Sequence, residues 1–240
     1  MTTSIELAVP ERALAIGAHP DDIVFGCGAT LAKWAAAGCA VTLLVLTDGS
    51  KGTWDPDADP EALVATRRTE QRAAAEALGA TGVQFLDRVD GELVDGRDEQ
   101  AEVCAVIRAV RPDVVAGHDP WKRYRIHPDH RRAGWLTLDA IVAARDPHFF
   151  PEQALAPHRP NFALLFEAEE IDHLEPVDEW LDAKIASLLA HRSQWRSTMN
   201  IADDGSGRDA FEKQIREVAA RAVGDTGLAA AESFKLLDDL

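Results

Sequence analysis

The chain has 240 residues, of which 46% are hydrophobic and 28% are charged, so it is long enough to bury a core without disulfide bonds. Its 41 acidic residues outnumber the 25 Lys and Arg and give a net charge of -16, which excludes the basic surface that nucleic-acid or membrane partners require. Three cysteines without a CxxC pair favour reduced thiols, and no run is apolar enough for a signal peptide or membrane span, so we expect a cytoplasmic protein.

Short apolar runs alternate with amphipathic segments along most of the chain. Buried strands are predicted at 13–18, 40–47, 83–86, 113–118 and 162–168. Helices are predicted between them at 22–38, 60–79, 99–110 and 128–144. Strands and helices in alternation indicate βαβ crossovers, and therefore an α/β fold with a mainly parallel, doubly wound sheet.

The C-terminal part of the chain is predicted to be mainly helical. It has helical patterns at 178–195 and 213–224, a polar loop at 200–209 and a short tail. No repeat or linker divides the sequence. We therefore expect a single domain over residues 1–240, with a core at about 12–170 and a helical C-terminal portion at about 175–240.

Polar motifs follow two of the predicted strands. HPDD starts at His19 directly after the strand at 13–18, and HPDH starts at His127 shortly after the strand at 113–118. In a doubly wound sheet the first strand usually lies beside the fourth, where the strand order reverses and the loops at the carboxyl ends open a crevice. We therefore expect the two motifs to converge, although about 110 residues separate them.

Histidine and aspartate in such a crevice favour a metal site. Two histidines and one carboxylate form a recurring catalytic zinc set that leaves a position open for water. His19 and Asp22 are three residues apart across a strand-to-helix turn, and a third ligand from the second motif would complete the set. Taken singly, each residue is better explained as a helix cap or a solvated loop residue, and Asp21 and Asp22 could simply complement a helix dipole. The combination at one sheet edge favours the metal.

The paired motifs AHPDD and HPDH resemble those of the LmbE-like deacetylases, also called the GlcNAc-PI de-N-acetylase or PIG-L family. FLDRVDGEL, RPDVVAGHDPW and KIASLLAHRSQ fit the same family, and the resemblance spans roughly residues 12 to 196. It implies a Rossmann-like three-layer sandwich with a metal site at the carboxyl ends of the first and fourth predicted strands. The implied activity is the zinc-dependent removal of an acetyl group from an N-acetylated amino sugar.

The resemblance also implies roles for individual residues. The metal ligands would be His19, Asp22 and His130, with Zn²⁺ as the metal, although Fe²⁺ tolerates the same ligands. Asp21 would be the general base, because an ionised carboxylate can accept a proton from the attacking water.

The first histidine of the HPDH motif has an implied catalytic role as well. His127 would stay unligated and, as an imidazolium, would support the oxyanion or protonate the leaving amine. Asp129 would hydrogen-bond His127 and raise its pKa. The chain departs from the family pattern at Ile23, where many members have Glu, and at Arg125, where some have a Tyr that contacts the oxyanion. Tyr124 lies one residue earlier.

Basic and aromatic residues near the motifs suggest substrate contacts. Lys122 and Arg125 are hypothesised to receive an anionic group of the substrate, the alternative being that the basic cluster around them is solvated. Trp54 and Trp121 could offer faces on which a sugar stacks.

Further residues are assigned by the same resemblance. Arg67 and Asp90 would line the substrate site, although Arg67 could instead pair with Glu70 on its own helix. His191 and Gln194 are expected to serve in packing.

The sequence leaves several functions open. A nucleotide-dependent oxidoreductase is disfavoured, because the carboxylates of HPDD fill the turn that would hold a pyrophosphate. An amidase acting on thiol–sugar conjugates and a non-catalytic sugar-binding protein of the same fold remain as alternatives to the deacetylase. Asp21 argues against the binder, which needs no base. The oligomeric state is open, and a homo-oligomer is compatible with the sequence.

Overall fold

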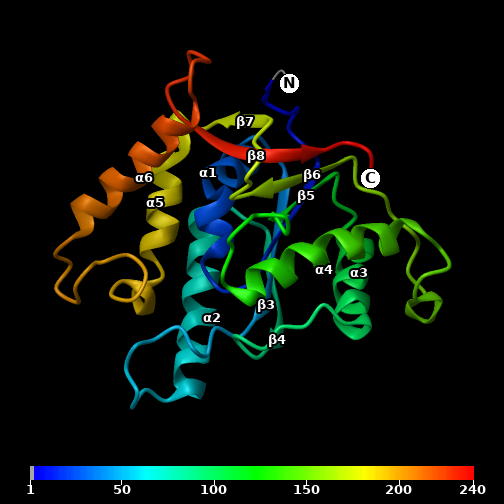
Figure 1. The fold of residues 1–240 in the computed structure, drawn as a ribbon, viewed down its shortest axis with the longest axis horizontal. Helices are drawn as coiled ribbons and strands as arrows, with labels where there is room; N and C mark the ends of the chain where they lie inside the picture. The colour runs from blue at the N-terminus through cyan, green and yellow to red at the C-terminus, as the bar shows by residue number, and fades with distance from the viewer. Residues whose placement is uncertain (1–2) are drawn as a thin grey trace.

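The computed structural model describes residues 3–240 and contains an eight-stranded sheet in the order β1-β7-β8-β6-β5-β2-β3-β4 (Figure 1). Five strands run parallel in its centre and along one side: β2 (Arg12–Gly17), β3 (Ala40–Thr47), β4 (Gly82–Arg88), β5 (Val114–His118) and β6 (Phe162–Phe166). The chain builds outward from β2 through β3 to β4 and then returns to place β5 on the other side of β2. The strand order therefore reverses between β2 and β5, as the sequence predicted.

The remaining strands form the opposite edge of the sheet: β1 (Ser4–Ile5), β7 (His173–Pro176) and β8 (Ala231–Leu237). β8 lies between β6 and β7 and is antiparallel to both. The prediction of a short tail after residue 224 was therefore wrong for this segment. The strand forms because two neighbours from distant parts of the chain offer unpaired backbone groups, which local sequence does not reveal.

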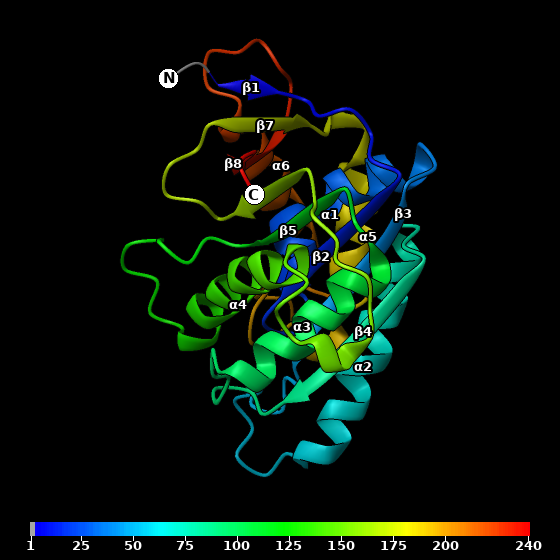
Figure 2. The same ribbon diagram turned by 90° about the vertical axis from the view of Figure 1, so that its right-hand side faces the viewer.

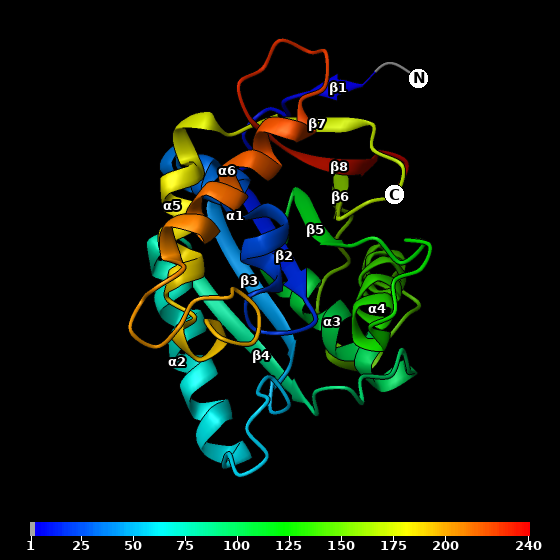
Figure 3. The ribbon, with the colours of Figure 1, turned by 60° about the vertical axis from the view of Figure 1, so that its left-hand side comes forward.

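Helices cover both faces of the sheet, and the three-layer α/β architecture is confirmed. One face carries α3 (Arg97–Val110) and α4 (Pro128–Arg145), which lie in front of the strands in Figure 2. The other face carries α1 (Asp22–Ala36) and α2 (Pro60–Ala77). An outer pair packs against them: α5 (Leu181–Leu189) and α6 (Arg208–Ala222), seen in front in Figure 3.

The predicted helix at 178–195 is shorter than expected. Only α5 is α-helical, and single turns of 3₁₀-helix at Asp178–Trp180 and Arg192–Gln194 flank it. Among residues 3–240, no helix combines the length and the hydropathy needed to traverse a lipid bilayer.

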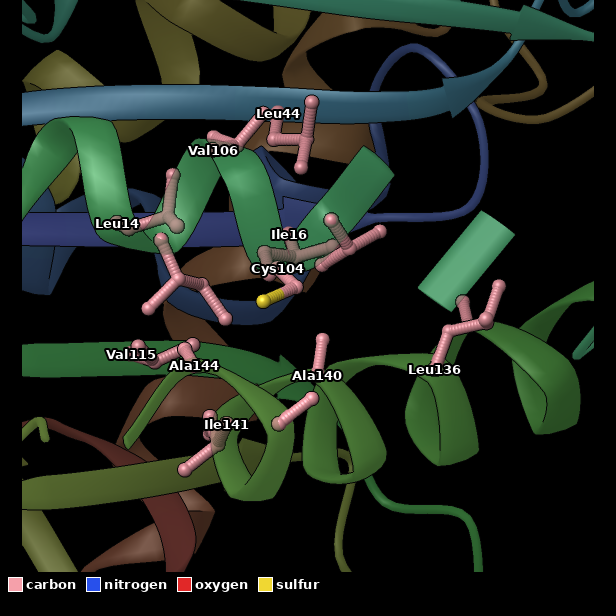
Figure 4. Packing of buried hydrophobic residues seen from close by; sticks show 14 of the residues in the cluster. Leu14, Ile16, Leu44, Cys104, Val106, Val115, Leu136, Ala140, Ile141 and Ala144 are labelled. Carbon is pink, nitrogen blue, oxygen red and sulfur yellow. The ribbon is translucent and has the colours of Figure 1, made fainter. Parts of the chain in front are cut away.

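Alternation along β2 distributes its side chains between two cores. Leu14 and Ile16 pack with α3 and α4 (Figure 4), while Ala13 and Ala15 pack under α1. Successive strand residues point to opposite faces, so a strand covered on both sides must be apolar throughout. Residues 13–18 are accordingly apolar throughout, and the first polar side chain, His19, follows beyond the carboxyl end of β2.

A buried ionic network ties the short edge strands to α1. The Glu175 carboxylate of β7 accepts hydrogen bonds from the backbone of Leu7 at 2.8 Å and from Lys33, and lies 2.9 Å from His173 Nε2. Burial by itself raises the pKa of Glu175, but these partners outweigh burial and hold the pKa below the ordinary 4.5.

We predict that Glu175→Gln lowers the free energy of unfolding by about 2–4 kcal/mol at pH 7, because it removes the buried anionic partner of the Lys33 ammonium and leaves only the exposed Glu6 carboxylate, 3.5 Å away. A depressed pKa stabilises the fold above the unfolded-state value and loses this effect as the pH falls through the folded-state value. The difference between wild type and variant should therefore shrink below pH 4.5. Urea unfolding across this pH range measures it, with the exposed Glu179→Gln as control. A pH-independent difference would contradict the prediction.

Candidate metal centre

The loops after β2 and β5 place polar side chains at the carboxyl edge of the sheet. β2 and β5 pair in parallel, from Ala13 opposite Val114 to Ala15 opposite Ala116. The chain leaves β2 toward α1 and leaves β5 toward α4, on opposite faces of the sheet. The two loops therefore diverge and open a crevice between them, as in other doubly wound sheets.

The structure brings His19, Asp22 and His130 together in this crevice. His19 Nδ1 lies 3.2 Å from Asp22 Oδ2 and 3.2 Å from His130 Nε2, and this Nε2 lies 3.4 Å from Asp22 Oδ1. A tetrahedral ion with bonds of about 2.1 Å to nitrogen or oxygen holds its ligand atoms roughly 3.3 Å apart. These distances, which involve both carboxylate oxygens of Asp22, are close enough for the three residues to share one divalent cation.

The His19 ring separates this triplet from two further carboxylates. His19 Nε2 lies 3.1 Å from Asp90 Oδ1 and 3.2 Å from Asp129 Oδ2. The Asp129 carboxylate is fully buried and accepts the backbone N–H groups of Gly91 and Leu93. With an ion bound, these acceptors would keep the ring proton on Nε2 and leave the Nδ1 lone pair to the ion, an arrangement typical of metal-ligating histidines.

Two more histidines extend the cluster. His127 has a ring nitrogen within 4.8 Å of donors on both His19 and His130, and His118 is placed likewise toward Asp22 and His130. His118 Nε2 lies 3.3 Å from Asp22 Oδ2, as expected of a side chain that orients a ligand.

An excess of carboxylates sets the charge of the cluster. Burial opposes the protonation of His19, but hydrogen bonds to Asp129 and Asp22 outweigh it and raise the imidazole pKa well above its ordinary value. Burial lowers the pKa of His130 to about 4, so this ring is neutral at pH 7. Burial opposes the ionisation of Asp22, yet His130 and His118 bring the pKa of this carboxyl well below its usual range. The carboxylates of the cluster therefore favour a positive charge among them, while the neutral His130 ring can offer a lone pair to a cation.

Asp21 lies beside the cluster with a backbone conformation that is rare outside glycine. Its φ is 99°, and strain of this kind concentrates at functional sites. Asp21 occupies the N-cap position of α1 but makes no capping hydrogen bond through its side chain, which lines a cavity instead. Burial raises the pKa of Asp21 to about 7, and the Arg67 guanidinium, 3.4 Å away, counteracts it. A cation bound nearby would further favour the ionised form.

The expected hydrogen bond between the side chains of His127 and Asp129 is not formed. His127 is the N-cap of α4, and its Nδ1 accepts the backbone N–H of Asp129 at 3.3 Å. Side chains two residues apart at a helix start do not face each other, so the Asp129 carboxylate contacts His19 instead. Burial, followed by the charge of His19, lowers the pKa of His127, whereas the sequence interpretation expected an increase. The neutral ring carries its proton on Nε2.

Lys122 and Arg125 lie outside the cavity wall formed by the described residues. Arg125 Nη1 lies 2.7 Å from His130 Nδ1, and its Nη2 lies 2.7 Å from Glu167 Oε2. Lys122 Nζ is 3.5 Å from the carbonyl oxygen of Ala168. Their contacts are with protein groups of α4 and of the segment after β6, and a role of either side chain in binding an anionic substrate group stays a prediction.

Sequence reasoning missed Glu167. It directly follows β6, and its Oε2 lies 3.4 Å from His118 Nδ1. Despite burial, His118 and Arg125 lower the pKa of Glu167 to about 2. An ion on His130 Nε2 would leave the ring proton on Nδ1, so Arg125 would have to turn wholly to Glu167. The rule that found the histidines, a polar residue after a central strand, would also have found this one.

Arg67 and Glu70 do not pair with each other. Arg67 is 3% exposed, and its Nη1 donates to the carbonyl of Gly49 at 3.0 Å while Nη2 reaches the carbonyl of Pro20. Glu70 accepts hydrogen bonds from the backbone and hydroxyl of Ser193. Arg67 therefore joins the loop after β2 to the loop after β3 underneath Asp21.

The cluster lies in a cavity of about 830 Å³. Trp54 lines this cavity and is 85% exposed, whereas Trp121 does not line it and packs edge-on against Trp135. Gln194, expected to serve in packing alone, also lines the cavity and donates to the backbone of the loop after β3. His191 is fully buried, and burial lowers its pKa to about 3.

The sequence profile of the PIG-L family, GlcNAc-PI de-N-acetylase, matches residues 14–141, more than half of the chain. The chain belongs to this family. It is 34% identical to diacetylchitobiose deacetylase of Thermococcus kodakarensis over 188 residues, which cover 77% of this chain and 70% of the relative. It is 36% identical to 1D-myo-inositol 2-acetamido-2-deoxy-alpha-D-glucopyranoside deacetylase of Actinosynnema mirum, over 84% of this chain and 85% of the relative.

The solved structure of a deacetylase has the same fold as this chain. N,N'-diacetylchitobiose deacetylase from Pyrococcus horikoshii superposes with a TM-score of 0.86 at 29% identity, covering 95% of this chain and 84% of that one. The family membership inferred from the HPDD and HPDH motifs is thereby confirmed.

Two positions separate this PIG-L member from the expected pattern. Ile23 is fully buried in the core under α1, and this position therefore contributes an apolar side chain where many family members have a carboxylate. Tyr124 is 87% exposed, with a φ of 64°. It is not among the residues of 3–240 that line the cavity.

We predict that the purified protein binds about one divalent ion per chain and that Asp22→Asn abolishes this binding. Asp129→Asn should retain the ion but weaken its affinity roughly 10–100-fold, because it disturbs the support of His19 without removing a proposed ligand. Competition with a chromophoric chelator measures both, and the exposed Asp98→Asn serves as control. Unchanged metal content in Asp22→Asn would rule out this ligand set.

Proposed function

We propose that this protein is a metal-dependent hydrolase that removes the acetyl group from the amide nitrogen of an N-acetylated amino sugar. The observation that carries the proposal is the close spacing of His19, Asp22 and His130, with the carboxylate of Asp21, which makes no helix-capping hydrogen bond, beside them. Family membership and two relatives named as deacetylases of acetylated sugars agree with this chemistry.

The proposed metal is Zn²⁺, held by His19, Asp22 and His130. Two nitrogens and one oxygen suit zinc with a position left open for catalysis, and Fe²⁺ accepts the same donors. When bound, the ion supplies Lewis-acid polarisation of the amide carbonyl and acidifies water.

Asp21 is the proposed general base. Its carboxylate lines the cavity, and Arg67 holds it from the protein side. It accepts a proton from the water that attacks the amide carbon and passes it toward the departing amine. Burial raises the pKa of the Asp21 carboxyl to about 7. A cation held by the neighbouring ligands would lower this pKa, so Asp21 would be ionised when the reaction begins.

His127 is the proposed donor to the reacting amide. Its Nδ1 is occupied by the Asp129 backbone N–H, so its Nε2–H is directed to other acceptors. The ring lines the cavity and packs edge-on against His19, with centroids 4.6 Å apart. A neutral donor at this place stabilises the developing oxyanion by a hydrogen bond, the task for which the sequence offers no tyrosine.

Asp90 and Asp129 support His19, and Asp90 also lines the cavity. Their carboxylates hold Nε2–H and so keep Nδ1 free. This support has no purpose in a sugar-binding protein without a metal, and it therefore favours the enzyme. We also propose a cytoplasmic location, because all three cysteines are free and buried.

We predict that Asp21→Asn lowers kcat about 10²–10⁴-fold, because the amide cannot accept the proton. The variant should keep its metal, since Asp21 is not among the three proposed ligands. The assay measures free amine released from N-acetylglucosamine, N,N'-diacetylchitobiose and an N-acetylglucosaminyl inositol by the zinc-loaded protein.

The matched control is Asp225→Asn, an exposed aspartate in the loop before β8. It should retain wild-type activity. Activity in Asp21→Asn equal to that of the control would refute the role of the base, and no amine from any acetamido sugar would refute the proposed function.

A further inference from the structure

The cavity that holds the metal cluster extends well beyond it. Its volume of about 830 Å³ lies in the upper half of the range of about 300–1,000 Å³ for small-molecule sites. One end is lined by His19, Asp21 and Asp22, and the other by residues of α5, α6 and β8. The second end is built from segments outside the region 14–141 that matches the family profile.

One stripe of α6 forms a wall of this distal end. Six residues of the helix line the cavity at spacings of three and four: Phe211, Gln214, Ile215, Val218, Ala219 and Ala222. Such spacing places side chains on one face of a helix, and five of the six are apolar. Phe211 and Ala219 are 5% exposed and Ile215 is 9% exposed, but Val218 on the same face is 51% exposed. Three of the five apolar residues are therefore buried in the core, Ala222 is half-buried, and Val218 exposes an apolar side chain at the cavity wall.

The charged groups of the distal end neutralise one another. Lys184 and Glu232 line it, and Lys184 Nζ lies 2.6 Å from Glu232 Oε1. Both are also engaged by α1, which is interrupted at Cys27: Glu232 accepts the backbone N–H groups of Ala29 and Thr30, and Lys184 donates to a carbonyl on the other side of the break. Lys184 and Glu232 thus find their partners within the protein, so among the described residues the distal end offers no unpaired charge to a ligand.

Phe25 connects the two ends. It lies one turn beyond Asp22 on α1, lines the cavity, and contacts the Phe211 ring edge-on with centroids 6.3 Å apart. A molecule with its amide at Asp21 can therefore continue along Phe25 onto the α6 stripe.

We propose that the α6 stripe and Phe25 bind an uncharged, apolar group attached to the amino sugar, so that the substrate is a glycoside with an apolar aglycone. This inference rests on the proposed deacetylase function. Burial of methylene groups favours binding, and part of this gain is retained in a site that is open to solvent. The subsite therefore selects among acetylated sugars without touching the reacting amide.

The test compares the methyl and n-hexyl glycosides of N-acetylglucosamine, in both anomers, with the zinc-loaded protein. For at least one anomer, we expect kcat/KM for the hexyl glycoside to exceed that for the methyl glycoside by tenfold or more. Val218→Asp should reduce this ratio at least fivefold, because it places a charge in the apolar stripe. Ala220→Asp, an exposed position of α6 outside the cavity wall, should leave the ratio unchanged.

The outcomes separate the two proposals. Equal kcat/KM for both glycosides, or a hexyl preference that Val218→Asp leaves intact, overturns the apolar subsite while deacetylation stands. Failure to release amine from either glycoside, when N,N'-diacetylchitobiose is hydrolysed, also overturns the subsite alone. Failure with all of them overturns both proposals. Because Val218 is half exposed, its replacement does not open the core, and circular dichroism of the variant verifies its folding.

Discussion

The parallel pairing of β2 with β5 is the constraint on which the site depends. Their register fixes the starting points of two loops. These loops place His19 Nδ1 3.2 Å from His130 Nε2, although the two residues are 111 positions apart in the sequence. No local feature of either loop could achieve this. The core residues on both faces of β2 therefore contribute to function by keeping the two loop origins adjacent.

The orientation of one imidazole carries this constraint into chemistry. His19 presents Nδ1 to the crevice because its Nε2 faces Asp90 and Asp129, and Asp129 is in turn anchored by the backbone of the 91–93 loop after β4. Three separate strand ends thus determine the direction of a single lone pair. The strained backbone at Asp21 belongs to the same arrangement, since it withdraws that carboxylate from helix capping and leaves it beside the crevice.

The sequence predicted the central strands, the switch point and the family, because these follow from apolar periodicity and from motifs at strand ends. It did not predict β8, whose pairing depends on β6 and β7. It proposed Arg125 as a substrate contact but did not reveal that Glu167 lies beside this side chain. It also paired His127 with Asp129, because spacing along a chain does not show which way side chains turn at a helix start. The sequence showed which residue types lie near the site, but only the three-dimensional structure shows which partner each side chain contacts.

The position of β8 has a consequence for how the molecule is made. Residues 231–237 fill an interior place in the sheet between strands that are synthesised earlier, and Glu232 on this strand closes the interruption in α1. A nascent chain emerging from the ribosome can therefore assemble β2 to β6, but the edge of β6 stays open until residues 231–237 have been translated. Such long-range closure is slow and leaves an unpaired strand exposed to other chains in the meantime.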